Sequence, residues 1–183
     1  MVTKSITAVA LDSALSKIRA FPNTPKPGVT FRDITPLLAD GDALKTIIDA
    51  MAEQIISNNI EVDAIVCPEA RGFIFGTALA YRLGIGMIPV RKPGKLPGKT
   101  IEISYDLEYG QDTLQIHADA IKKGQKVLLV DDVLATGGTM LACKQLLIKQ
   151  GADIQACVFL MTLKDLPGLS ILAPTPIISL ITY

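Results

Sequence analysis

The stretch from Val127 to Thr139 constrains the fold more than any other part of the chain. Four apolar residues are followed by Asp131 and Asp132, and then by a turn rich in glycine and threonine. A short apolar run that leads through such a turn into helical spacing is typical of a buried parallel strand followed by a helix. Ligands in such folds bind at the carboxyl ends of the strands, so this turn is a candidate site.

The same rhythm of strand, turn and helix recurs along the chain. The pattern predicts strands at residues 64–67, 87–90, 126–130, 156–163 and 177–182, and helices at 5–20, 41–58, 73–83 and 139–150. Asp40 or Asp42 is expected to cap the second helix, and Gly151 to end the last one. Four prolines within 21–40 predict an ordered, irregular arm without regular helix. We therefore expect an α/β fold, with a central, mainly parallel sheet flanked by helices on both faces.

Composition narrows the possible partners. The 183 residues suit a single domain covering 1–183, and 18 basic residues balance 18 acidic ones. This balance argues against binding to nucleic acid or to an acidic membrane surface. We expect no cleaved signal peptide, because Lys4 and Asp12 leave no long apolar stretch between them. We expect no membrane-spanning helix in the uncharged segment 166–183, because prolines interrupt it. Three scattered cysteines in apolar runs suggest reduced thiols and a cytoplasmic location.

The turn after the two acids has the properties of a phosphate site. Gly137 and Gly138 allow close approach, and backbone N–H groups converge there with the positive end of a helix dipole. Thr136 and Thr139 add donors, and the acid pair upstream suits two neighbouring hydroxyl groups. A bulky side chain at Gly137 is expected to occupy the phosphate's place. The alternative is an ordinary strand-to-helix turn with a solvated acid pair.

This segment resembles the thirteen-residue phosphoribosyl pyrophosphate signature of type I phosphoribosyltransferases. The resemblance implies the fold of that family, with an N-terminal hood at about 21–40 and a flexible lid loop at about 91–103. It also implies that Asp131 and Asp132 bind the ribose 2- and 3-hydroxyls. The 5-phosphate would be held by Ala135, Thr136, Gly137, Gly138 and Thr139.

Two further segments carry charge suited to a diphosphate. The turn at 69–73 contains Arg71, and residues 91–99 contain four cations with two prolines and two glycines. Taken alone, Arg71 is as easily explained as an ordinary surface arginine. The cationic stretch at 91–99, taken alone, is typical of a solvated loop. In the family resembled, the first turn binds pyrophosphate, which gives that role to Ala70 and Arg71. A cationic lid would neutralise the departing pyrophosphate and exclude water, with Arg91, Lys92 and Lys95 as its active residues.

The motifs at 21–34, 69–73, 91–98 and 104–110 together resemble adenine phosphoribosyltransferases over nearly the whole chain. The resemblance implies that Glu108 handles a purine proton and that Tyr105 closes over the site. The hood would recognise adenine through Val29, Thr30, Phe31 and Arg32, with Phe31 stacked on the ring. Phe31 and Tyr105 remain open to interpretation as packing residues. We interpret His117 and the cysteines as structural.

The implied reaction joins adenine to the ribose 5-phosphate of phosphoribosyl pyrophosphate, giving AMP and pyrophosphate. Mg²⁺ is the expected cofactor, bound mainly through the substrate and not by a dedicated protein site. The family is expected to form homodimers. Two alternatives stay open: an enzyme for another purine, such as xanthine or hypoxanthine, and a regulator that senses phosphoribosyl pyrophosphate. The regulator would need a DNA-binding domain and a basic surface.

Overall fold

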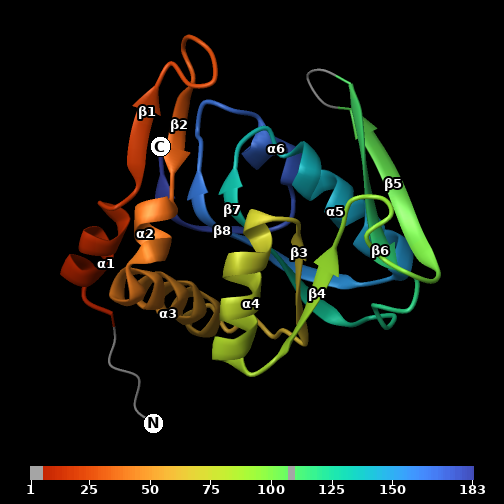
Figure 1. Cartoon of the computed structure of the whole chain (residues 1–183). Helices are drawn as coiled ribbons and strands as arrows, with labels where there is room; N and C mark the ends of the chain where they lie inside the picture. Colours follow the sequence, from red (N-terminus) through yellow and green to blue (C-terminus); the bar gives the residue numbers. More distant parts are fainter. Residues whose placement is uncertain (1–5, 107–109) are drawn as a thin grey trace.

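Five parallel strands form the centre of the computed structural model, which describes residues 6–106 and 110–183. They lie in the order β4-β3-β7-β8-β9, and every neighbouring pair is parallel, so their carboxyl ends share one edge (Figure 1). Their bounds are β3 Ala64–Pro68, β4 Gly86–Val90, β7 Lys126–Leu134, β8 Asp153–Thr162 and β9 Ile177–Thr182. The parallel sheet predicted from the sequence is confirmed.

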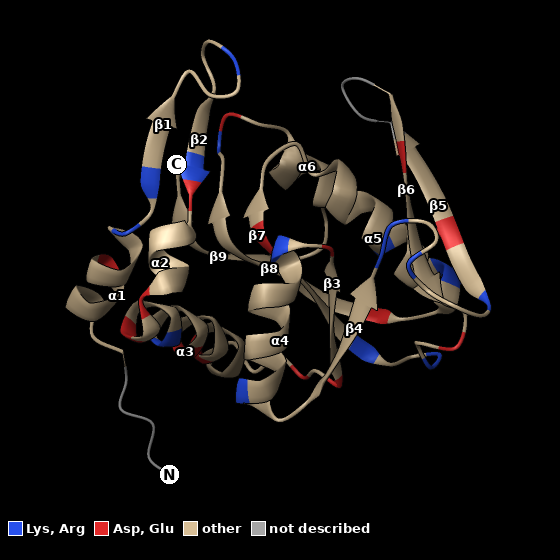
Figure 2. Cartoon of the chain, viewed as in Figure 1, with Lys and Arg blue, Asp and Glu red and all other residues tan. Residues whose placement is uncertain are grey.

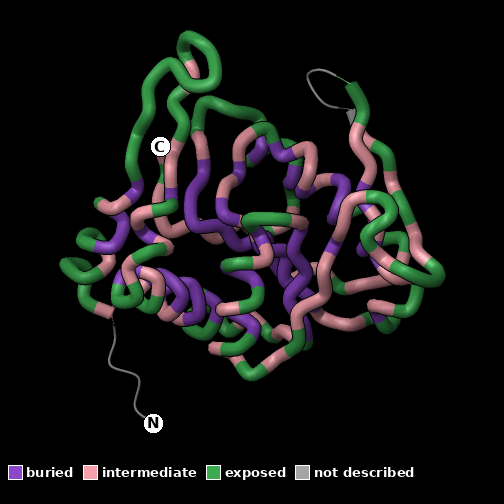
Figure 3. The backbone as a smooth tube through the Cα atoms, viewed as in Figure 1, coloured by how far each residue is buried: buried purple, intermediate pink, exposed green. Residues whose placement is uncertain are grey.

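Helices cover both faces of this sheet, as the sequence predicts. Leu128 and Val130 of β7 pack with α1, α3 and α4, whereas Val127 and Leu129 face α5 and α6. The central strands are accordingly the most buried part of the chain (Figure 3). The helices are α1 Ala8–Leu15, α2 Thr35–Ala39, α3 Gly41–Ser57, α4 Arg71–Leu83, α5 Gly138–Gln150 and α6 Gly168–Leu172. Within the described ranges, none of them is long and apolar enough to cross a membrane.

Two antiparallel hairpins stand on either side of the sheet's carboxyl edge (Figure 1). One consists of β1 Arg19–Pro22 and β2 Thr30–Asp33, and the other of β5 Thr100–Asp106 and β6 Gln111–His117. The second hairpin packs against α5 through Ile101, Ile103 and Leu114. The site predicted after β7 therefore lies between two projecting hairpins.

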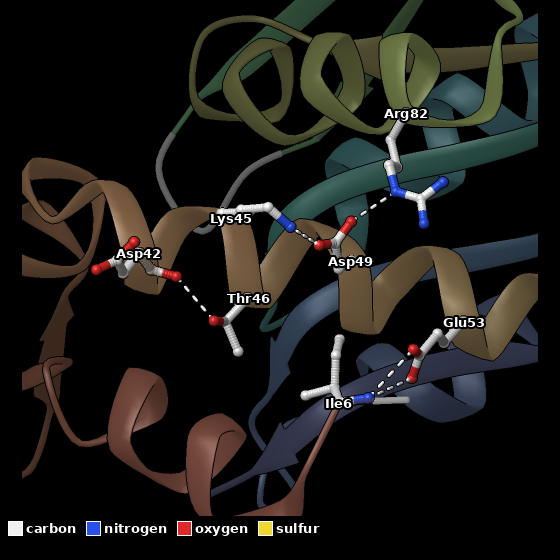
Figure 4. Close-up of polar contacts among 7 residues, drawn as sticks. All are labelled: Ile6, Asp42, Lys45, Thr46, Asp49, Glu53 and Arg82. Atoms are coloured by element: carbon white, nitrogen blue, oxygen red, sulfur yellow. Dashed lines mark hydrogen bonds and ion pairs between the residues drawn. The ribbon is translucent and has the colours of Figure 1, made fainter. Parts of the chain in front are cut away.

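Polar contacts of α3 fix its position against α4 and the N-terminal segment (Figure 4). The Asp49 carboxylate accepts from Arg82 Nε of α4 at 2.6 Å and also pairs with Lys45. The backbone N–H of Ile6 donates to Glu53 Oε1 at 3.2 Å. As predicted, Asp40 caps α3 by accepting from the Ala43 N–H at 2.9 Å. The contact between Asp49 and Arg82 joins α3 to α4, whose first turn reaches the site.

The N-terminal arm differs from the prediction of an irregular segment without helix. Residues 19–33 form the β1–β2 hairpin, with Phe21 opposite Phe31 and Arg19 ion-paired with Asp33. The short helix α2 follows, and Pro36 lies in its first turn, where a missing N–H costs no intrahelical hydrogen bond. The first helix, predicted over 5–20, ends at Leu15, because the chain from Arg19 onward pairs with β2.

Three other element boundaries differ from those predicted from the sequence. β7 does not end at the two acids but continues to Leu134, because β8 pairs with it as far as Thr162. The helix expected from residue 73 begins at Arg71. The loop expected over 91–103 ends before Thr100, where β5 begins to pair with β6. These shifts place the two acids within a strand and Arg71 on a helix.

Candidate functional site

A cavity of about 280 Å³ lies at the carboxyl ends of β3 and β7. It is lined by Glu69, Ala70, Arg71, Asp131, Asp132, Val133, Leu134, Ala135, Thr136, Gly137, Gly138, Thr139 and Met140. The structure therefore brings together two segments that the sequence marks separately, the turn after β3 and the turn after β7. Both carry groups that bind anions or hydroxyls.

The loop between β7 and α5 presents a helix N-terminus to the cavity. Gly137 is the N-cap residue of α5, with φ +85°, and the helix runs for 13 residues. Because glycine has no side chain, no N-cap side chain occupies the N–H groups of the first turn, and the helix dipole adds positive potential there. An anion in this part of the cavity would accept hydrogen bonds from these N–H groups.

A side chain at Gly137 would meet a different part of the molecule from the one expected. A Cβ atom on this residue would lie 2.9 Å from Gly168 Cα, so it would press on the start of α6, whereas the expectation was a clash with a bound phosphate. Gly168 is itself held close, because its N–H donates to the Ala135 carbonyl at 3.1 Å. A Cβ on Gly168 would lie 2.4 Å from that oxygen. Gly168 was not among the residues predicted from the sequence, because its only local signal is the preceding Pro167.

The two acids at the end of β7 are enclosed and close together. Asp132 is 2% exposed, and the Asp131 carboxylate accepts from the Asp132 N–H at 2.8 Å. Burial raises the pKa of Asp131 to about 8, and the Asp132 charge adds to the shift. Burial also raises the pKa of Asp132, against the opposing charge of Arg71. Carboxylates in such an enclosed place suit hydrogen-bond donors such as hydroxyl groups.

The first turn of α4 brings Arg71 to these acids. Arg71 Nε lies 3.0 Å from Asp132 Oδ2, so a basic group at the start of α4 faces the acidic end of β7 (Figure 2). The peptide between Glu69 and Ala70 is cis. Gly72 is helical, and a Cβ there would lie 3.1 Å from Asp131 Oδ1. The absence of a side chain at Gly72 therefore allows the close approach of α4 to β7.

We expect Asp131→Asn to stabilise the unliganded protein increasingly as pH rises. The folded-state pKa of Asp131 is about 8 against 3.8 for an ordinary aspartate, so between these values the folded chain holds a proton that the unfolded chain releases. The contribution of Asp131 to the free energy of unfolding therefore falls as pH rises from about 4 to 8. Asn does not titrate, so the variant does not lose this stability. The gain should reach roughly 1–3 kcal/mol at pH 8 in urea unfolding, after allowance for the nearby Arg71 charge.

The control for this measurement is Asp119→Asn, at an exposed position on the loop after β6. Its unfolding free energy should follow the parent's at every pH. A stability difference between Asp131→Asn and the parent that stays constant from pH 5 to pH 8 would contradict the raised pKa.

The cationic segment after β4 lies outside the cavity lining. Arg91 pairs with Glu69 and lies 5.6 Å from the centroid of the Phe73 ring, while Lys92 pairs with Asp112 of β6. The segment rests along β6, since the N–H of residue 94 donates to the Gln115 side chain at 3.3 Å. Lys95 is exposed and likewise absent from the lining residues. Arg91, Lys92 and Lys95 are therefore close to the site but not in it.

Tyr105 reaches the loop after β7 from β5. Its hydroxyl lies 3.2 Å from Thr139 Oγ1 and donates to Asp112 Oδ2 at 3.0 Å. Burial raises the pKa of Tyr105, so this hydroxyl keeps its proton at neutral pH. Tyr105 thus lies at the edge of the loop between β7 and α5. Glu108, the other predicted catalytic residue, lies outside the described residues.

The predicted hood residues occupy the β1–β2 hairpin. Val29 precedes β2, and Thr30 and Phe31 are exposed on it, with 42% of Phe31 accessible. The Arg32 guanidinium carbon lies 3.6 Å from the centroid of the Tyr183 ring. Phe31 is therefore not a core residue, and Arg32 connects the hairpin to the end of the chain. None of these four residues lines the cavity after β7.

Residues 37–166 match the model of the phosphoribosyl transferase domain family. The adenine phosphoribosyltransferase of Clostridium botulinum (strain Eklund 17B / Type B) is 53% identical over 167 residues, which cover 91% of this chain and 96% of that relative. A crystal structure of adenine phosphoribosyltransferase from Thermoanaerobacter pseudethanolicus is similar, with a TM-score of 0.90 at 47% identity, covering 94% of this chain and 99% of that one.

A third similar protein is the adenine phosphoribosyltransferase of Saccharomyces cerevisiae, solved in complex with an imino-altritol bisphosphate and adenine. Its structure has a TM-score of 0.90 at 36% identity and covers 95% of this chain and 99% of that one.

Proposed function

Because the chain belongs to the adenine phosphoribosyltransferase family, we propose that the cavity after β7 is where it binds phosphoribosyl pyrophosphate for transfer to adenine. The reaction gives AMP and pyrophosphate, as in purine salvage. The observation that carries this proposal is the loop at 135–139, which presents the uncapped N-terminus of α5 beside two enclosed carboxylates. This arrangement suits one phosphate and the neighbouring diol of a ribose.

Each side of the cavity has a proposed role. Ala135, Thr136, Gly137, Gly138 and Thr139 hold the 5-phosphate, and Asp131 and Asp132 accept hydrogen bonds from the ribose hydroxyls. Ala70 and Arg71 bind the pyrophosphate. What supports these roles is their shared position: both segments line one cavity, and Arg71 already faces the two acids at 3.0 Å from Asp132. Substrate oxygens would then compete with Asp132 for the guanidinium.

Adenine enters, in this proposal, between the cavity and the β1–β2 hairpin. The exposed ring of Phe31 is available for stacking, and main-chain groups near Thr30 and Arg32 would accept hydrogen bonds from the exocyclic amine of the base. Tyr105 borders the 5-phosphate through Thr139. Glu108 would handle the purine proton, an assignment that rests on the family motif alone.

The protein's own part in the reaction is to position reactants and stabilise charge. As adenine N9 attacks ribose C1, the bond from C1 to pyrophosphate breaks and the sugar acquires oxocarbenium character. Arg71 offsets negative charge on the departing pyrophosphate, and the α5 N-terminus keeps the 5-phosphate in place. No covalent enzyme intermediate is needed.

Asp131 and Asp132 also fit a magnesium cofactor held mainly through the substrate. Among residues 6–106 and 110–183, no group of three or more His, Cys, Asp or Glu side chains could hold a metal. Mg²⁺ usually binds through one or two carboxylates together with substrate phosphates. When bound, Mg²⁺ neutralises charge on the pyrophosphate oxygens. Its binding should therefore depend on phosphoribosyl pyrophosphate being present.

The proposed function is tested by offering adenine, hypoxanthine, guanine and xanthine in parallel with phosphoribosyl pyrophosphate and Mg²⁺. We expect adenine to be converted to AMP with the highest kcat/KM. A higher kcat/KM for hypoxanthine or xanthine would overturn the assignment of adenine while leaving the phosphoribosyl site intact.

We expect Lys95→Ala to lower turnover more than it weakens adenine binding. Lys95 is exposed outside the cavity, and a cation on this segment would act on the leaving pyrophosphate, not on the base. Losing one charged hydrogen bond of about 1.5–3 kcal/mol predicts a fall in kcat of roughly 10- to 150-fold. Steady-state kinetics would measure this, with Lys149→Ala on α5 as control. A change confined to the KM for adenine would contradict the role.

The homodimer and the cytoplasmic location are also proposed. Cys67, Cys143 and Cys157 are buried free thiols, which suits a reducing compartment. Light scattering during size-exclusion chromatography would report the mass, and the 19.5 kDa chain should elute with about twice that mass if it pairs.

A further inference from the structure

Asp112 connects β5, the cationic segment at 91–99 and, through Tyr105, the loop at 135–139. No sequence motif identifies it as a site residue. It lies on β6 directly opposite Tyr105 of β5, so both side chains share one face of the hairpin. Asp112 Oδ2 accepts from the Tyr105 hydroxyl at 3.0 Å and also pairs with Lys92 of the cationic segment. Asp112 Oδ1 accepts from the Thr113 N–H at 2.9 Å, which fixes the orientation of the carboxylate.

The contact continues from Tyr105 into the phosphate loop. The Tyr105 hydroxyl lies 3.2 Å from Thr139 Oγ1, and a Cβ on Gly138 would lie 3.7 Å from the Tyr105 ring. A hydroxyl has one proton, and Tyr105 uses its proton to donate a hydrogen bond to the Asp112 carboxylate. Thr139 is therefore the donor in its contact with Tyr105, which fixes the Thr139 rotamer.

The ionisation of both groups agrees with this direction of donation. The hydrogen bond from Lys92 lowers the pKa of Asp112, so the carboxylate is charged at neutral pH. Burial raises the pKa of Tyr105, so its hydroxyl remains a donor. The carboxylate is partly enclosed, with 22% of its side chain exposed against 39% for Lys92.

We propose that Asp112 is a positioning residue for phosphoribosyl pyrophosphate, holding Lys92 directly and Thr139 through Tyr105. This inference rests on the proposed function, because it takes 135–139 as the phosphate loop. The inference adds a chain of contacts, through Asp112 and Tyr105, between that loop and Lys92 at the start of the cationic segment. Asp112 touches neither substrate; it sets where two phosphate-binding groups stand before the substrate arrives.

Two substitutions distinguish the contact of Asp112 with Lys92 from its contact with Tyr105. Asp112→Asn removes the charge that holds Lys92 but keeps an amide oxygen that accepts from Tyr105. Asp112→Ala removes both contacts. We expect the KM for phosphoribosyl pyrophosphate to rise by about 3- to 30-fold in Asp112→Ala and less in Asp112→Asn, since neutral and partly exposed contacts are individually weak. The KM for adenine should stay unchanged, because the hood lies outside the cavity.

The route through Tyr105 is tested in the Tyr105→Phe background, where the extra loss of Asp112→Ala over Asp112→Asn should disappear. Asp119→Asn is the control, since Asp119 is an exposed acid just after β6. It should behave as the parent. If the parent converts adenine while Asp112→Ala keeps the parental KM, only the inference fails; if the parent converts no adenine, the proposed function fails.

Two other outcomes would also overturn the inference. One is a rise in both KM values together with a lower melting temperature, which would mean a purely structural role. The other is a difference between Asp112→Ala and Asp112→Asn that persists in Tyr105→Phe, which would mean that Tyr105 does not carry the effect.

Discussion

Gly137→Val should abolish measurable AMP binding and also lower stability. A Cβ on this residue would lie 2.9 Å from Gly168 Cα, and the φ of +85° disfavours any branched side chain. The loop must move, so the phosphate loses at least two charge-assisted hydrogen bonds of about 1.5–3 kcal/mol each, or roughly 100-fold or more in affinity. Calorimetric titration with AMP and urea unfolding would measure the two effects.

Gly124→Ala is the matched control for this variant. Gly124 also has a positive φ, +77°, but a Cβ there would meet nothing within 4 Å. It should lose about 1–2 kcal/mol of stability from backbone strain while AMP affinity stays at the parental value. If Gly137→Val bound AMP as tightly as Gly124→Ala, the phosphate would not be held by this loop.

Glu108→Gln should retain the fold and the affinity for phosphoribosyl pyrophosphate while losing turnover. Adenine must react through N9, so an imidazole proton has to be lost or held elsewhere as the new bond forms. A carboxylate is ionised at neutral pH, with a reference pKa of about 4.3, and stabilises the N–H on N7 as positive charge grows on the purine. Gln keeps the shape without the charge, and we expect the rate of the chemical step to fall by about 10- to 10,000-fold.

Single-turnover kinetics would measure this effect, because slow product release would hide it in kcat. Glu108→Leu should lose more, since it cannot hydrogen-bond to the ring. Asp119→Asn also removes one acid, at an exposed position just after β6, and should leave the chemical step unchanged. A Glu108→Gln enzyme with the parental single-turnover rate would remove Glu108 from the mechanism.

Much of the candidate site was predictable because its parts are contiguous. Asp131, Asp132 and the loop at 135–139 lie on one strand, one turn and one helix start, and all of them line the cavity. Ala70 and Arg71, whose role was implied by the family resemblance, line the same cavity, because the turn after β3 opens at the same edge of the parallel sheet. The position of Arg91, Lys92 and Lys95 beside β6 was not predictable, because it depends on contacts with Glu69, Asp112 and Gln115.

The sequence by itself determined the elements whose causes are local. Apolar runs specified the buried strands, Asp40 the start of α3 and Gly151 the end of α5. Only the tertiary structure decided that residues 19–33 pair as a hairpin, that Gly137 rests on Gly168 and that Asp112 holds Lys92 and Tyr105. Periodicity and capping act between residues a few positions apart, whereas these contacts join segments that meet only after the sheet and its hairpins have packed.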